Sequence, residues 1–126
     1  MKTTIEHFVV PSRKGLARIL YAARYSVFGL RHAWKQEAAF QQEIILCAVL
    51  LPVVLMVNVS GLERAMLLGT AILVIIVELL NSALEAVVDR IGLEFHPLSG
   101  SAKDMGSAAV LVSLILMAGV WLCILL

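Results

Sequence analysis

The sequence predicts an all-α membrane protein, a single domain over residues 1–126 with three transmembrane helices and an N-terminal amphipathic helix. Of the 126 residues, 61% are hydrophobic, 15% are charged and 6% are aromatic. Average soluble domains are about 45–50% apolar and about 25% charged, so this chain has too few charges to cover a soluble surface. The low aromatic content argues against a membrane β-barrel, whose girdles use Trp and Tyr. Composition therefore excludes a soluble enzyme, a disordered tail and a disulfide scaffold.

The first predicted element is an amphipathic helix over about residues 12–36. Its apolar side chains recur at steps of three and four, which is typical of a helix with one apolar face. That stripe consists of Leu16, Leu20, Ala23, Val27, Leu30 and Trp34. Basic residues lie off the stripe, and a basic amphipathic helix joined to a membrane span is typical of one lying in the interface. The alternative is a solvated helix that packs on nothing.

Three long apolar runs follow, and each predicts a transmembrane helix. We place these helices at about residues 41–59, 64–90 and 104–126. Each run is long enough, because about 20 residues cross the hydrocarbon core of about 30 Å. A tight turn over residues 58–64 joins the first two helices, and a loop over residues 89–104 joins the second to the third.

The distribution of positive charge predicts the orientation. Nine of the ten Lys and Arg lie in the N-terminal segment or in the 89–104 loop, and the exception is Arg64. Because positive residues stay on the cytoplasmic side, the N-terminus and the loop are expected in the cytoplasm and the C-terminus outside. The net charge of +1 provides no basic surface for nucleic acid.

Acidic side chains on one face of the second span are the main functional signal. At 100° per residue, Glu85 and Asp89 fall about 20° to either side of Glu78. Asn81 and Ser82 flank the same face. An acidic residue at the centre of a membrane helix costs at least about 2.5–3.5 kcal/mol, and packing requires none of these three. We therefore expect a functional face toward the cytoplasmic end of this helix.

Other charged residues are expected at the same depth. Glu37 and Glu43 lie at the start of the first span, and Lys103 and Asp104 open the third. Oxygen ligands of this kind suit Mg²⁺, which takes one or two carboxylates together with substrate phosphates. The sequence holds no zinc-type His/Cys spacing and no Walker-type glycine loop.

Two other interpretations of the acidic residues stay open. Glu85 and Asp89 could form interfacial ion pairs with Arg90, Lys103 or Lys35. A small ion or proton-coupled transporter also uses carboxylates in the membrane, although such sites usually lie near the midplane between repeated halves.

Three stretches of the chain resemble the prokaryotic integral-membrane diacylglycerol kinases of Gram-negative type. They are residues 33–43 (AWKQEAAFQQE), 77–90 (VELLNSALEAVVDR) and 98–109 (LSGSAKDMGSAA). The resemblance implies a homotrimer in the bacterial inner membrane, with the N-terminal helix on the surface. It implies transfer of the γ-phosphate of MgATP to diacylglycerol, giving phosphatidic acid. An undecaprenol kinase of the same fold is the alternative, which the triplet His96-Pro97-Leu98 favours.

The resemblance also implies roles for individual residues. Glu78 matches the general base for the lipid hydroxyl, and Glu37 and Glu85 match the ligands of Mg²⁺. The positions that match ATP contacts are Tyr25, Glu37, Asn81, Glu85, Asp89, Glu94, His96, Lys103 and Asp104. Those that match lipid contacts are Arg18, Ser26, Arg31, Trp34, Phe40, Arg64, Glu78, Ser107 and Trp121. Tyr21 and Phe28 stand where members of the family have lysines, which weakens any expectation of a phosphate contact there.

Overall fold

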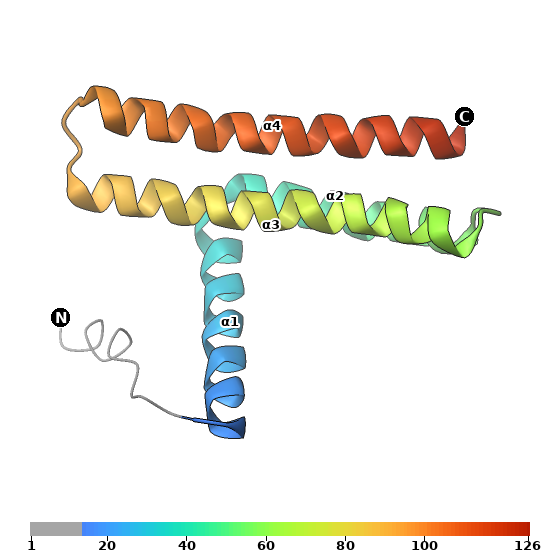
Figure 1. Ribbon diagram of the computed structural model, residues 1–126, viewed down its shortest axis with the longest axis horizontal. Coiled ribbons are helices and arrows are strands. Elements are labelled where there is room, and N and C mark those ends of the chain that lie inside the picture. Colours follow the sequence, from blue (N-terminus) through green and yellow to red (C-terminus); the bar gives the residue numbers. More distant parts are fainter. Residues whose placement is uncertain (1–13) are drawn as a thin grey trace. The chain divides into compact units, whose positions relative to one another are not determined.

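The computed structural model describes residues 14–126, and that range contains helices and no strand (Figure 1). The helices are α1 (Leu16–Gln36), α2 (Ala38–Met56), α3 (Gly61–Ile91) and α4 (Pro97–Leu125). Helices α2, α3 and α4 are long and apolar enough to cross a membrane. Over residues 14–126, the prediction of an all-α fold with three candidate spans is confirmed. Lys2 and Arg13, which contributed to the predicted orientation, and residue 12 of the predicted first helix lie outside the described residues.

The chain forms two compact units that divide between His32 and Ala33. In the first unit, Gly15 precedes α1 with a φ of 72°, a conformation that favours glycine. The apolar stripe of α1 is open, and Leu16 and Leu20 are 71% and 62% exposed. An exposed apolar stripe is what an interfacial helix requires, and the position of α1 in the membrane interface stays a prediction.

In the second unit, the chain passes from the last turn of α1 into α2 at Glu37. This residue is extended, with φ −114° and ψ 105°. Its N–H donates to the Ala33 carbonyl at 2.9 Å, and its own carbonyl accepts from the Gln41 N–H at 3.2 Å. The side-chain amide of Gln41 also donates to the Trp34 carbonyl. These bonds satisfy backbone groups that helix ends leave unpaired, so Glu37 is held at the start of α2.

The turn between α2 and α3 is shorter than the predicted 58–64 segment, because α3 already begins at Gly61. Ser60 and Glu63 form a capping box: the Glu63 N–H donates to Ser60 Oγ at 3.2 Å, and the Ser60 N–H donates to Glu63 Oε2 at 2.8 Å. The guanidinium of Arg64 donates to the carbonyls of Val54 and Val57 at the end of α2. Both helix ends at this turn are therefore closed by side chains.

The predicted loop over residues 89–104 is too long, because α3 continues to Ile91 and α4 begins at Pro97. His96 caps α4 by accepting the Leu98 N–H on Nδ1 at 3.1 Å. Proline fits the first turn of a helix, where its missing N–H has no partner to lose. Pro97 therefore starts the helix about seven residues before the apolar run that predicted it.

Helix α3 is the centre of the bundle and packs against both α4 and α2 (Figure 1). Val54 and Leu67 are fully buried, and Ala71, Val74 and Met117 form a small cluster. Many other apolar side chains of α2–α4 point outward, as expected for helices that face lipid. At about 1.5 Å per residue, the 31 residues of α3 extend about 46 Å, so α3 is longer than the hydrocarbon core.

Candidate active site

The acidic face of α3 runs from a buried to an exposed environment. Glu78 is 6% exposed, Asn81 and Glu85 are half-buried, and Asp89 is exposed. Asn81 Nδ2 donates to Glu85 Oε1 at 3.4 Å, which links successive turns of the helix. Helical periodicity alone explains this alignment, because residues three and four apart share a face. The face therefore offers one carboxylate inside the bundle and others near its end.

Three further carboxylates surround Glu78. Glu37 and Glu85 lie close enough to interact with it electrostatically, and so does Glu43. Glu37 and Glu43 belong to the start of α2, whereas Glu78 and Glu85 belong to the second half of α3, so the pairing of these two helices brings them together. Neighbouring carboxylates repel one another when all are ionised, and a bound cation or a proton would relieve that repulsion.

Two buried polar atoms near this cluster have no hydrogen-bond partner within the described chain. They are Glu43 Oε2 and Asn81 Oδ1. Buried polar groups in proteins are nearly always paired, so each unpaired one requires an explanation. A site that binds a polar ligand is one explanation, since the ligand supplies the missing partner.

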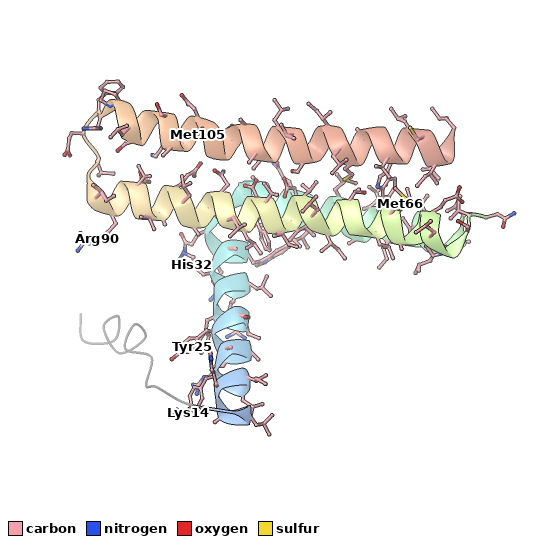
Figure 2. All side chains as sticks on the ribbon, in the orientation of Figure 1. Lys14, Tyr25, His32, Met66, Arg90 and Met105 are labelled. Carbon is pink, nitrogen blue, oxygen red and sulfur yellow. The ribbon has the colours of Figure 1, made fainter. Side chains whose placement is uncertain are left out.

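A pocket of about 160 Å³ lies at the turn between α3 and α4. Its lining includes Asp89, Glu94, His96 and Lys103. Lys103 Nζ lies 2.6 Å from Asp89 Oδ1, and both side chains are nearly half exposed. Arg90 is at the same end of α3, but its side chain points away from α4 (Figure 2). Lys103, rather than Arg90, therefore neutralises Asp89.

The predicted nucleotide residues of the second unit are thus mostly near one another. Asp89, Glu94, His96 and Lys103 share the pocket, and Asn81 and Glu85 lie along the same face of α3. Asp104 is exposed on α4 and does not line the pocket. Tyr25 lies in the first unit, and its role stays a prediction, as do those of Arg18, Ser26 and Arg31.

The predicted lipid residues of the second unit are more scattered. Trp34 is 43% exposed and Phe40 only 3%, so Phe40 offers little surface to a lipid. Ser107 is exposed on α4. Arg64 and Trp121 lie toward the opposite end of the bundle, where the indole Nε1 of Trp121 donates to Leu67 O and Thr70 Oγ1, both at 3.2 Å. In this structure Arg64 and Trp121 connect helices, and their lipid contacts stay predictions.

One close contact beside the site, between α3 and α4, has no signal in the sequence. Gly106 is buried, and a Cβ at this position would collide with Asn81 Oδ1. A glycine in an apolar run is common in membrane helices, so composition could not distinguish this one. Glu43 was visible in the sequence as part of the acidic group, but no pattern assigned it a separate role.

The fold and the site define a class: α-helical membrane proteins with several carboxylates gathered inside a helix bundle. Comparison with known proteins identifies the family. The family model described as "Prokaryotic diacylglycerol kinase" matches residues 24–125. The chain therefore belongs to the prokaryotic diacylglycerol kinase family, and the resemblance drawn from its motifs is confirmed.

Individual relatives agree with this assignment. The chain is 57% identical over 114 residues to the diacylglycerol kinase of Escherichia coli K12, covering 89% of this chain and 91% of the relative. It is 53% identical over 112 residues to that of Pseudomonas aeruginosa, with the same two coverages. The diacylglycerol kinase of Haemophilus influenzae is 43% identical over 107 residues, covering 85% and 91%.

Proposed function

We propose that this protein is a diacylglycerol kinase of the bacterial inner membrane that transfers the γ-phosphate of MgATP to the hydroxyl of diacylglycerol. Family membership supports the kinase activity and the lipid acceptor, because relatives that carry this name match most of the chain. The observation that carries the mechanism is the buried carboxylate of Glu78 with Glu37 and Glu85 beside it.

Glu78 is proposed as the general base. The hydroxyl of diacylglycerol gives its proton to the Glu78 carboxylate while its oxygen bonds to the γ-phosphorus. The bond from that phosphorus to the bridging oxygen of ADP breaks, and ADP leaves with the electron pair. A base must lie within hydrogen-bond reach of the proton that it takes. Burial of Glu78 inside the bundle suits an acceptor whose acyl chains stay in the bilayer.

Glu37 and Glu85 are proposed to hold the Mg²⁺ that accompanies ATP. No group of three or more His, Cys, Asp or Glu within residues 14–126 is arranged to hold a metal by itself. Two carboxylates and substrate phosphates nevertheless fit Mg²⁺, which seldom uses an all-protein cage. Bound Mg²⁺ supplies charge neutralisation on the phosphates, which is the main requirement of phosphoryl transfer. The nearby unpaired atom, Asn81 Oδ1, offers a further polar contact for ligand or water.

The pocket at the α3–α4 turn is proposed to take part of the nucleotide. Lys103 would offset negative charge on the phosphates, a role compatible with its exposure and its ion pair with Asp89. Glu94 and His96 line the same pocket and are available for neutral or cationic parts of the nucleotide. We further propose a homotrimer with sites shared between subunits, a cytoplasmic N-terminus and an α1 that lies in the interface.

One assay tests the activity and the acceptor together. The purified protein in mixed micelles receives ATP labelled in the γ-phosphate, with diacylglycerol in one reaction and undecaprenol in a second. We expect label in phosphatidic acid. Label only in undecaprenyl phosphate would overturn the choice of acceptor. Label in neither lipid, together with ion uptake by vesicles containing the protein, would favour the transporter.

A further inference from the structure

We infer that Gly106 is a positioning residue for the nucleotide and metal site, because its missing side chain makes the space in which the Asn81 amide lies. This inference rests on the proposed function and adds to it a residue of α4 that is assigned no contact with either substrate. The inference concerns how closely α4 approaches α3 where Gly106 faces Asn81.

The glycines of this chain fall into two groups. At Gly15, Gly29, Gly61, Gly69, Gly100 and Gly119, an added Cβ would meet nothing within 4 Å. At Gly92 and Gly106 it would collide with another side chain. Those side chains are Glu94 and Asn81, which are both among the predicted nucleotide contacts. The two glycines at which an added Cβ would meet a side chain therefore both lie beside predicted nucleotide contacts.

The contact at Gly106 is harder to relieve than the contact at Gly92. Gly106 is buried, and its Cβ position lies 3.2 Å from Asn81 Cγ and 3.8 Å from Leu84 Cδ2, with Asn81 Oδ1 closer still. Gly92 instead faces the exposed carboxylate of Glu94, which can turn into solvent. Asn81 is only half-buried, so its amide can also move, but it moves as one planar group.

Movement of that amide affects Glu85. Asn81 Nδ2 lies 3.4 Å from Glu85 Oε1, near the outer limit of a hydrogen bond. Displacing Oδ1 from Gly106 also displaces Nδ2, because both atoms belong to the same amide, and the bond to Glu85 is lost. Glu85 is a proposed Mg²⁺ ligand, so Gly106 acts on the metal through Asn81. Outer partners that orient metal ligands typically matter by about 10- to 100-fold in affinity or activity.

The fold should tolerate a methyl group at this position. The atom that must move is the far end of a side chain and not backbone. Alanine also favours a helix interior more than glycine does. Gly106→Ala is therefore expected to fold and to be impaired in its site.

The test measures Mg²⁺-dependent binding of a non-hydrolysable ATP analogue by calorimetry, alongside thermal unfolding in detergent. The variants are Gly106→Ala, Asn81→Ala and the double variant. Gly119→Ala is the matched control, because Gly119 lies in the same helix and an added Cβ there would meet nothing within 4 Å. We expect Gly106→Ala to raise the Mg²⁺ concentration for half-maximal binding by about tenfold. Gly119→Ala should leave it unchanged, and both single glycine variants should keep the wild-type unfolding midpoint or exceed it.

The double variant tests the route through Asn81. Once Asn81 is alanine, the methyl at position 106 has nothing to displace, so the double variant should match Asn81→Ala. Effects that multiply, or a Gly106→Ala titration equal to that of the wild type, would overturn the inference. Should Gly106→Ala fail to fold, recovery of folding in the double variant supports the contact, and failure of both overturns it. A wild-type protein that neither binds the analogue nor phosphorylates lipid would overturn the proposed function itself.

Discussion

The two ends of the α2–α4 bundle use polar side chains in opposite ways. At the end where α2 turns into α3, marked by Met66 in Figure 2, Ser60, Glu63, Arg64 and Trp121 all make hydrogen bonds to neighbouring turns or helices. In the half of the bundle nearer the α3–α4 turn, Glu43 Oε2 and Asn81 Oδ1 are buried without a hydrogen-bond partner among residues 14–126. The first end is paired internally, and the second keeps polar groups available for a ligand.

The physical reason for this difference is the cost of unpaired polar groups. A buried polar group without a partner costs about 1–3 kcal/mol, so a fold selected only for stability would pair or remove it. The three carboxylates near Glu78 increase that cost by mutual repulsion. The half of the bundle that carries the candidate site therefore lowers the free energy of unfolding, and the hydrogen bonds of the opposite end raise it.

The largest effect is expected at Glu78. Glu78→Gln keeps the shape of the side chain but cannot accept a proton from the lipid hydroxyl. Turnover should fall by roughly 100- to 10,000-fold, the usual contribution of a general base. Phosphate transfer to diacylglycerol measures the loss, and binding of a non-hydrolysable MgATP analogue should be retained. Near-normal turnover would remove Glu78 from the role of base.

Glu85→Gln should change the metal requirement. A neutral amide replaces one of two proposed carboxylate ligands, so the Mg²⁺ concentration for half-maximal rate should rise by at least about tenfold. A magnesium titration of phosphate transfer at saturating ATP provides the measurement. A Mg²⁺ dependence identical to that of the wild type would contradict the assignment of Glu85 as a ligand.

At the opposite end, Trp121→Phe should reduce stability. Removing the indole N–H leaves Leu67 O and Thr70 Oγ1 without this donor, and the loss should be about 1–2 kcal/mol. Unfolding of the detergent-solubilised protein by denaturant measures it. Trp34→Phe is the control, because the Trp34 side chain is 43% exposed and should matter less. Equal losses in the two variants would mean that the hydrogen bonds of Trp121 contribute nothing specific.

The smallest effect is expected at the N-cap of α3. Ser60→Ala removes the acceptor for the Glu63 N–H and should lower stability by about 1 kcal/mol. Glu63→Gln is the matched control, since glutamine also completes a capping box. The Mg²⁺ dependence of phosphate transfer should be unchanged in both variants, because the N-cap is at the end of α3 away from Glu78. A changed Mg²⁺ dependence would contradict the separation of the two ends.

Much of the fold and part of the site could be predicted because the signals are local. Apolar run length predicted three spans, and helical periodicity placed Glu78, Glu85 and Asp89 on one face. The predicted helix ends were less accurate. Helix α4 begins at Pro97, inside the predicted loop, because the His96 cap and the proline start a helix before its apolar residues begin. The Ser60–Glu63 capping box was readable as a motif, but the apolar runs alone set the predicted boundaries.

The sequence by itself determined the class of protein, the three apolar helices and the acidic face, since each depends on spacing within one segment. Only the tertiary structure decided which segments meet. It paired Lys103 with Asp89, Trp121 with Leu67 and Thr70, and Gly106 with Asn81, across separations that no local pattern encodes. The physical reason is that helix periodicity fixes directions around one axis, whereas contacts between helices depend on how closely two axes approach. At Gly106 that approach leaves room for the Asn81 amide because the residue lacks a Cβ atom.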